Sequence, residues 1–129
     1  MFNRQPTKPT RRVAAVVAIT ALSLLGAACG PGASGGTSGD VYEAIDKAFG
    51  PYGQTAKAVR VAECESGLNP MAGYPDAYYK GLFQLGPHIQ GAIDHYGGNW
   101  FDAYQNSAAA RDLYVTRGDW SAWPTCGRS

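Results

Sequence analysis

Glu65 is the residue whose type and setting best suit proton-transfer chemistry. It lies in the segment AECESG at 62–67, where Gly67 is a favourable residue for ending a helix. The negative end of a helix dipole disfavours ionisation of a carboxyl, and an apolar wall would raise its pKa further. Such a carboxyl can keep a proton near neutral pH and give it to a glycosidic oxygen. A lone glutamate there is more often a solvated surface residue. Motifs elsewhere in the chain are therefore needed to distinguish a catalytic acid from a surface residue.

Further motifs surround and follow Glu65 in a defined order. Ser66 is the next residue and Asn69-Pro70 comes shortly after, and then the chain reads GLFQL at 81–85 and NSAAA at 106–110, with Leu-Tyr at 113–114. In this order and spacing, the motifs resemble the soluble lytic transglycosylase branch of the lysozyme superfamily. The closing segment RGDWSAWPTC at 117–126 is similar to small secreted lysozyme-like domains of bacteria. The resemblance covers residues 59–126, which is most of the chain beyond its N-terminal leader.

The resemblance implies a lysozyme-like enzyme that cuts the bond between N-acetylmuramic acid and N-acetylglucosamine in bacterial peptidoglycan. It implies that Glu65 is the single catalytic acid/base and that the products carry 1,6-anhydro ends. Ser66 would support that helix end beside the substrate, Gln84 would reach a sugar or its N-acetyl group, and Asn106 would face the cleft.

One departure from the family pattern keeps two alternatives open. Soluble transglycosylases carry a late Ala-Tyr-Asn-Ala-Gly segment whose tyrosine approaches the glutamate, and this chain has the Trp-rich tail in its place. A lysozyme-type hydrolase of the same bond is therefore the first alternative. A cell-wall-binding lipoprotein without catalytic activity is the second, although a protein that had lost catalysis would often have lost its acid.

Aromatic side chains supply the sugar-binding surfaces that such a cleft would need. Their faces stack on the apolar faces of sugars while their polar tips stay hydrated. We expect Tyr78, Tyr79 and Trp123 at the cleft, and Trp100 and Trp120 in the core.

No second catalytic carboxylate, metal site or cofactor is predicted. His88 and His95 could share a helix face, but no cysteine or aspartate stands at ligand spacing from them, so they are expected on the surface. The remaining candidate acids of the domain are expected to be surface or capping residues: Asp76, Asp94, Asp102 and Asp119.

Helical signals dominate the elements that must position these residues. Asp40 is predicted to cap a helix over 41–49 with the apolar stripe Val41, Ile45 and Phe49, and Thr55 to cap one ending near Ser66. Further helices are predicted over 88–96 and about 101–116, each followed by glycine. Residues 71–85, rich in Gly, Tyr and Pro, are predicted to form turns with a short hairpin. We therefore expect a mostly α (α+β) lysozyme-like domain with a small irregular or β element after the catalytic helix.

The N-terminal residues have the features of an export signal. Arg4, Lys8, Arg11 and Arg12 precede an uncharged apolar run over 13–28. The run has about 16 residues, fewer than the roughly 20 that span a bilayer, so we predict a secretory signal at 1–28. Residues 30–39 (GPGASGGTSG) follow as a flexible tether, and the folded domain is expected over 40–129.

The three cysteines are expected to divide into one lipid site and one disulfide. Cys29 follows Leu25-Gly26-Ala27-Ala28, which resembles a lipobox with its leucine one place too early, and ordinary signal-peptidase cleavage stays open. A lipid on Cys29 would leave Cys64 and Cys126 to pair in an oxidising compartment. The protein is then expected outside the cell, either anchored to the membrane and facing the wall or secreted.

The charge of the predicted mature domain argues against nucleic acid as a partner. Ten acidic and seven basic residues lie beyond the leader, an excess of three negative charges. A mildly acidic surface lacks the electrostatic footprint of nucleic-acid binding. The expected partners are peptidoglycan glycan strands and, through Cys29, the membrane, and we expect a monomer.

Overall fold

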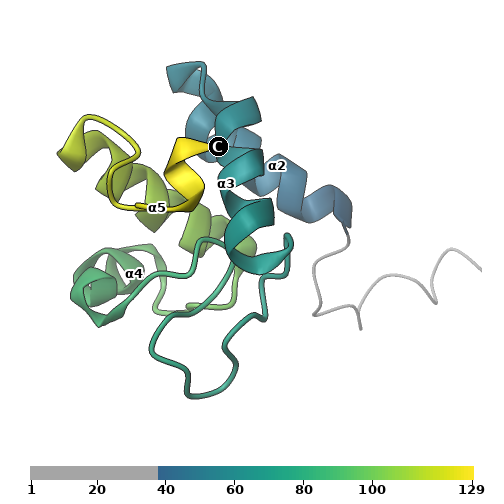
Figure 1. Cartoon of the computed structure of the whole chain (residues 1–129). Helices are drawn as coiled ribbons and strands as arrows, with labels where there is room; N and C mark the ends of the chain where they lie inside the picture. The colour runs from purple at the N-terminus through teal and green to yellow at the C-terminus, as the bar shows by residue number, and fades with distance from the viewer. Residues whose placement is uncertain (1–37) are drawn as a thin grey trace, which may run out of the picture. The chain divides into compact units, whose positions relative to one another are not determined.

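A computed structural model describes residues 38–129, all within one compact unit of the chain. The predicted signal at 1–28, the lipid site Cys29 and most of the tether lie outside the described residues. Figure 1 shows the helices of this unit. They are α2 (Ser38–Phe49), α3 (Thr55–Ser66), α4 (Gln90–Tyr96) and α5 (Ala103–Arg117), joined by the 3₁₀ turns η1 (Gly50–Tyr52), η2 (Pro87–Ile89) and η3 (Cys126–Arg128). The described part of the chain is therefore mostly helical and contains no strand, as the prediction of a mostly α fold requires.

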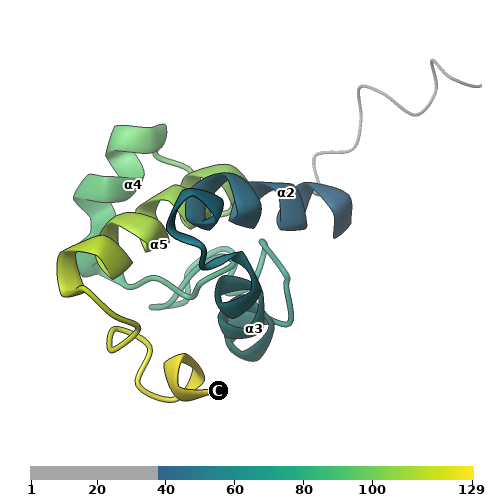
Figure 2. The same cartoon turned by 90° about the horizontal axis from the view of Figure 1, so that it is seen from above.

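The core forms where α2 packs on α5, and Figure 2 shows these two helices side by side. The predicted stripe is confirmed, because Val41, Ile45 and Phe49 are all buried. Phe49 stacks on Trp120 with ring centroids 5.2 Å apart and contacts Phe83 at 5.5 Å. Alanines on both helices are buried, and their small side chains suit dense packing between the helices.

The starts of three helices differ from the prediction by one to three residues. α2 begins at Ser38, so Asp40 stands in the first turn and two predicted tether residues are helical. Thr55 is the first residue of α3, and its hydroxyl donates to Asp46 at 2.7 Å instead of capping the helix. Asp102 has extended backbone and accepts from the Gln105 N–H at 2.9 Å, so α5 starts at Ala103, not near Phe101.

The segment between α3 and α4 is irregular and holds one antiparallel bridge. Lys80 and Leu85 exchange both backbone hydrogen bonds, N to O, at 3.1 and 2.9 Å. Gly81 and Gln84 have positive φ in the turn between them. A Cβ on Gly81 would lie 2.2 Å from the Trp100 carbonyl oxygen, so only glycine fits. The predicted hairpin is thus reduced to a single bridge.

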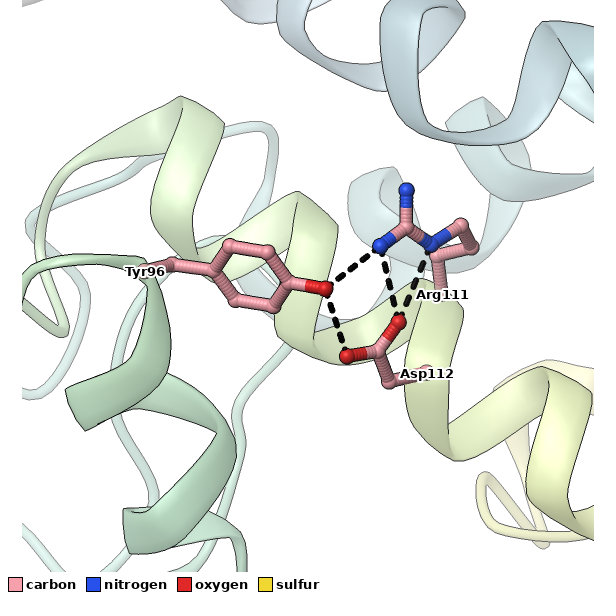
Figure 3. A network of polar contacts seen from close by, with 3 residues as sticks. All are labelled: Tyr96, Arg111 and Asp112. Carbon is pink, nitrogen blue, oxygen red and sulfur yellow. Dashed lines mark hydrogen bonds and ion pairs between the residues drawn. The ribbon is translucent and has the colours of Figure 1, made fainter.

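The helix predicted over 88–96 is divided, since Pro87–Ile89 form the turn η2 and α4 begins at Gln90. A polar network then joins α4 to α5 (Figure 3). The Tyr96 hydroxyl donates to Asp112 at 2.6 Å and accepts from Arg111 at 2.6 Å. Arg111 also pairs with Asp112 at 2.8 Å, so the network fixes the orientation of α4 on α5.

Cys64 on α3 is joined to Cys126 in η3, with the Cα atoms 5.6 Å apart. The predicted disulfide is therefore confirmed, at a normal Cα separation. It fixes the C-terminal segment against α3, where the yellow coil of Figure 1 lies beside that helix.

Candidate active-site cleft

A cleft of about 300 Å³ opens between the C-terminal end of α3 and the C-terminal segment. One wall comes from α3 and the irregular segment that follows it, and the other comes from residues 122–126, fixed by the disulfide. Its lining residues are Glu65, Tyr79, Gln84, Ala122, Trp123, Pro124, Thr125 and Cys126.

Glu65 reaches the cleft from the last turn of α3. Gly67 ends that helix in the left-handed conformation, and its N–H closes onto the carbonyls of Ala62 and Glu63. Burial raises the pKa of the Glu65 carboxyl above its ordinary value. Among residues 38–129, no side chain or backbone group forms a hydrogen bond or ion pair with this carboxyl. Glu65 is therefore a half-buried carboxyl that lines the cleft and has no partner among the described residues.

Ser66 holds the helix end to the segment after it. Its hydroxyl donates to the carbonyls of Ala62 at 3.0 Å and Leu82 at 2.7 Å. Ser66 does not line the cleft, so the predicted support of the helix end is present, whereas contact with a ligand has no geometric basis.

Asn106 is fully buried and fixes the turn that carries Gln84. Its Oδ1 accepts from the Phe83 N–H at 2.8 Å, and its Nδ2 donates to the carbonyls of Lys80 at 3.2 Å and Trp100 at 3.0 Å. A side chain with an exposed fraction of 0% cannot also touch a bound sugar. The expectation that Asn106 faces the cleft is therefore replaced by a positioning role.

Gln84 lines the cleft with an amide whose direction is fixed. Its Nε2 donates to the carbonyls of Gly81 at 3.0 Å and Ala72 at 3.3 Å. These two bonds leave the amide oxygen without a partner among the described residues. Gln84 therefore offers an acceptor to an N–H or hydroxyl of a ligand, close to Glu65.

The aromatic residues predicted at the cleft separate into two groups. Trp123 is 4% exposed, and its indole N–H donates to the Phe83 carbonyl at 2.9 Å, so it forms a rigid wall. Tyr79 lines the cleft and is 53% exposed. Tyr78 stands outside the cleft, while Trp100 and Trp120 are partly buried against the core.

Sequence reasoning did not identify Ala122, Pro124 and Thr125 as part of the cleft wall. The sequence marks them only by position, because Ala122 precedes Trp123, and Pro124 and Thr125 stand between Trp123 and Cys126. Because the disulfide places this stretch against α3, the predicted pairing could have identified them.

Among the described residues, Glu65 is the only acid that lines the cleft. Three of the other candidate acids hold local structure: Asp94 accepts from Gln90, Asp102 caps α5, and Asp119 accepts from the Ser121 N–H. Asp76 is an exposed loop residue. These positions agree with the prediction of surface and capping acids.

A second cavity, of about 260 Å³, lies between α2, α4 and α5. Its charged lining residues are Lys47 and Arg111, and no carboxylate of the described part of the chain lines it. It therefore lacks an acid for glycosidic chemistry.

The two histidines, His88 and His95, are exposed. Residues 38–129 contain no group of acids, histidines and cysteines that could hold a metal ion. No helix in this part of the chain is long and apolar enough to cross a membrane.

Comparison with models of protein families, with curated proteins and with solved structures finds no match to this chain. The interpretation of the cleft therefore depends on its own geometry and on the motifs of the sequence.

Proposed function

We propose that this protein cleaves the bond between N-acetylmuramic acid and N-acetylglucosamine in peptidoglycan, with Glu65 as the single general acid/base. The observation that carries the proposal is the Glu65 carboxyl, which faces the cleft without a partner from the described residues. Burial and the end of α3 both favour its protonated form. The motif order that resembles lytic transglycosylases supports the same assignment.

In the first step, Glu65 gives its proton to the oxygen that bridges the two sugars, and the bond from that oxygen to C1 of N-acetylmuramic acid breaks. The N-acetyl oxygen of this N-acetylmuramic acid attacks C1, and the N-acetylglucosamine side of the strand leaves with a free hydroxyl. In the second step, the Glu65 carboxylate takes the proton of the C6 hydroxyl, whose oxygen displaces the N-acetyl oxygen from C1. The product is a 1,6-anhydro sugar, and Glu65 is protonated again.

The lining of the cleft favours this route over direct hydrolysis. Glycosidases that use water or a covalent intermediate usually have a second carboxylate on the other side of the sugar. Within residues 38–129, Glu65 is the only acid in this lining, so the internal nucleophile of the substrate fits better. The free amide oxygen of Gln84 can orient the N-acetyl N–H for that attack.

The products released from purified peptidoglycan test the proposal. We expect mass spectrometry to find muropeptides that end in 1,6-anhydro-muramic acid, each lighter by one water than its reducing-end counterpart. Reducing ends would favour the hydrolase alternative. If the glycan strands stayed intact although the protein bound to them, the protein would be a wall-binding module and the proposed catalysis would be wrong.

From the N-terminal sequence we propose that a lipid on Cys29 anchors the domain to the cell membrane, where it faces the cell wall. One acyl chain alone binds reversibly, whereas two or more anchor stably. Cys29→Ser is expected to move most of the protein from the membrane fraction into the medium. Wild-type protein found in the medium with an unmodified Cys29, or without it, would instead mean ordinary secretion.

A further inference from the structure

Exposed aromatic side chains are concentrated next to the cleft. Of the seven large hydrophobic side chains that are exposed within the described residues, four lie between positions 71 and 79. Tyr74 and Tyr78 are 64% and 65% exposed, and Tyr79 is 53% exposed. Such a concentration on one short segment is typical of a binding surface, because single scattered hydrophobics are the normal case. We name the surface of Tyr74 and Tyr78 the tyrosine platform.

The backbone beneath the platform is held in a defined conformation. The Ala77 N–H donates to the Gly73 carbonyl at 3.0 Å, and the Gly81 N–H donates to the Ala72 carbonyl at 2.8 Å. Gly73 has a φ of 82°, and a Cβ there would lie 2.3 Å from the Tyr79 carbonyl oxygen. The two ends of the segment are thus in direct contact, so the rings are presented without a large cost of ordering on binding.

A ring contact joins Tyr78, one side of the platform, to the cleft. Tyr78 meets Tyr79, a cleft residue, with ring centroids 4.8 Å apart and planes at 77°. Tyr74 is held edge-on by Phe101 at 5.1 Å. A polymer that fills the cleft beside Tyr79 can therefore extend directly onto Tyr78.

The chemistry of the platform identifies the class of ligand. Asp76 is the only charged residue between 71 and 79, and no cation there could bind a phosphate or carboxylate. Hydrated aromatic faces with hydroxyl tips suit sugars, which present an apolar face and hydroxyls together. The ligand that fits is an uncharged stretch of glycan.

We infer that the tyrosine platform binds sugars of the glycan strand beyond those in the cleft, and that it gives the protein a preference for long strands over short fragments. This inference rests on the proposed function, since it assumes that a glycan occupies the cleft. Each ring is expected to strengthen polymer binding about twofold to tenfold.

Equilibrium binding tests the inference in the Glu65→Gln background, where bound glycan stays intact. Binding to insoluble purified peptidoglycan and to a soluble tetrasaccharide fragment of its glycan is compared for Tyr78→Ala and Tyr74→Ala. Both variants should weaken polymer binding about twofold to tenfold and leave tetrasaccharide binding unchanged. Tyr78→Phe should keep wild-type polymer binding, because it retains the ring, and Tyr42→Ala is the matched control on α2, where Tyr42 is 48% exposed.

The outcomes separate this inference from the proposed function. Unchanged polymer binding in both alanine variants would overturn the platform while the function stood. Equal losses on polymer and tetrasaccharide would also overturn it, because the rings would then act inside the cleft or through the fold. Parent protein that bound neither ligand would overturn both, and capture of a protein partner through the platform instead of glycan would contradict it. Platform-dependent binding without cleavage by the wild type would support the platform and contradict only the proposed catalysis.

Discussion

Glu65→Gln is expected to lower the rate of peptidoglycan cleavage by about 10²–10⁴-fold and to leave the fold intact. Glutamine keeps the size and shape of the side chain but has no proton to give to the bridging oxygen. The carboxyl has no partner among residues 38–129, so its replacement removes no internal hydrogen bond or ion pair. Release of anhydro ends from purified peptidoglycan measures the rate, and circular dichroism checks the fold.

Glu63→Gln provides a matched control on the same helix. Glu63 is exposed, two residues before Glu65, and does not line the cleft. The same replacement of a carboxyl by an amide on α3 should therefore leave the rate close to that of the wild type. A Glu65→Gln variant that digests peptidoglycan as fast as the Glu63→Gln control would show that the catalytic assignment is wrong.

The raised pKa of Glu65 gives the same prediction a pH dependence. Burial raises this pKa above its ordinary value of 4.5, so the active protonated form persists to higher pH than for a solvated glutamate. The cleavage rate should fall as pH rises through the raised pKa.

The same raised pKa makes the stability of the fold depend on pH. The stability that the neutral Glu65 carboxyl contributes is complete below pH 4.5 and declines above it, since ionisation of a buried acid costs free energy. In urea unfolding, the free energy of unfolding of Glu65→Gln should therefore increase relative to that of the wild type as pH rises from 4.5. A difference between the two proteins that stayed constant with pH would contradict the raised pKa.

Elements that depend on local periodicity could be predicted from the sequence. The stripe Val41, Ile45 and Phe49 has helical spacing and is buried as expected. Gly67 and Gly118 end α3 and α5 in the left-handed conformation that glycine allows. These features are set by neighbours within a turn or two, so no tertiary information is needed to find them.

The role of Asn106 could not be predicted from its own surroundings in the sequence. Its amide binds backbone groups of Lys80 and Phe83, which are 26 and 23 residues away. Periodicity can place Asn106 on a helix, but only the packed structure decides whether its amide meets solvent or a buried turn. For the same reason the sequence could not show that Tyr79 lines the cleft while Tyr78 lies outside it. The direction of each ring depends on how residues 71–80 fold back on themselves.

The disulfide was accessible to sequence reasoning for a different reason. Once Cys29 is assigned to lipidation, parity and an oxidising compartment leave one pairing for the remaining two cysteines. The number of cysteines could not show, however, that the bond would build part of the cleft. The bond carries Trp123, Pro124 and Thr125 to α3, so a single long-range contact builds one wall of the cleft.

Removal of this bond, in the double variant Cys64→Ala/Cys126→Ala, is expected to lower the free energy of unfolding by roughly 4 kcal/mol. The bond closes a loop with a sequence separation of 62, and the chain-entropy model gives about this value for such a loop. Small domains have only about 5–15 kcal/mol in total, so the loss is a large share of the stability. Urea unfolding of the oxidised wild type and the double variant measures it.

Reductant supplies the matched control for the double variant. Dithiothreitol should lower the stability of the wild type toward that of the variant and leave the variant unchanged. Equal stability of the two oxidised proteins would mean that the bond does not support the fold.

The same variant should also lose activity under conditions where it remains folded. Trp123 keeps its indole bond to the Phe83 carbonyl and its ring contact with Phe83 at 6.0 Å, so the tail stays partly docked. Lys57 still donates to the Ser129 carbonyl at the end of the chain, but within the described residues the side chains of Pro124 and Thr125 form no hydrogen bond, so this part of the wall should loosen first. Because that wall faces Glu65, we expect weaker glycan binding and a higher KM, with a smaller change in kcat. A fall in kcat alone, with an unchanged KM, would mean that the bond acts on the Glu65 carboxyl itself and not on the wall.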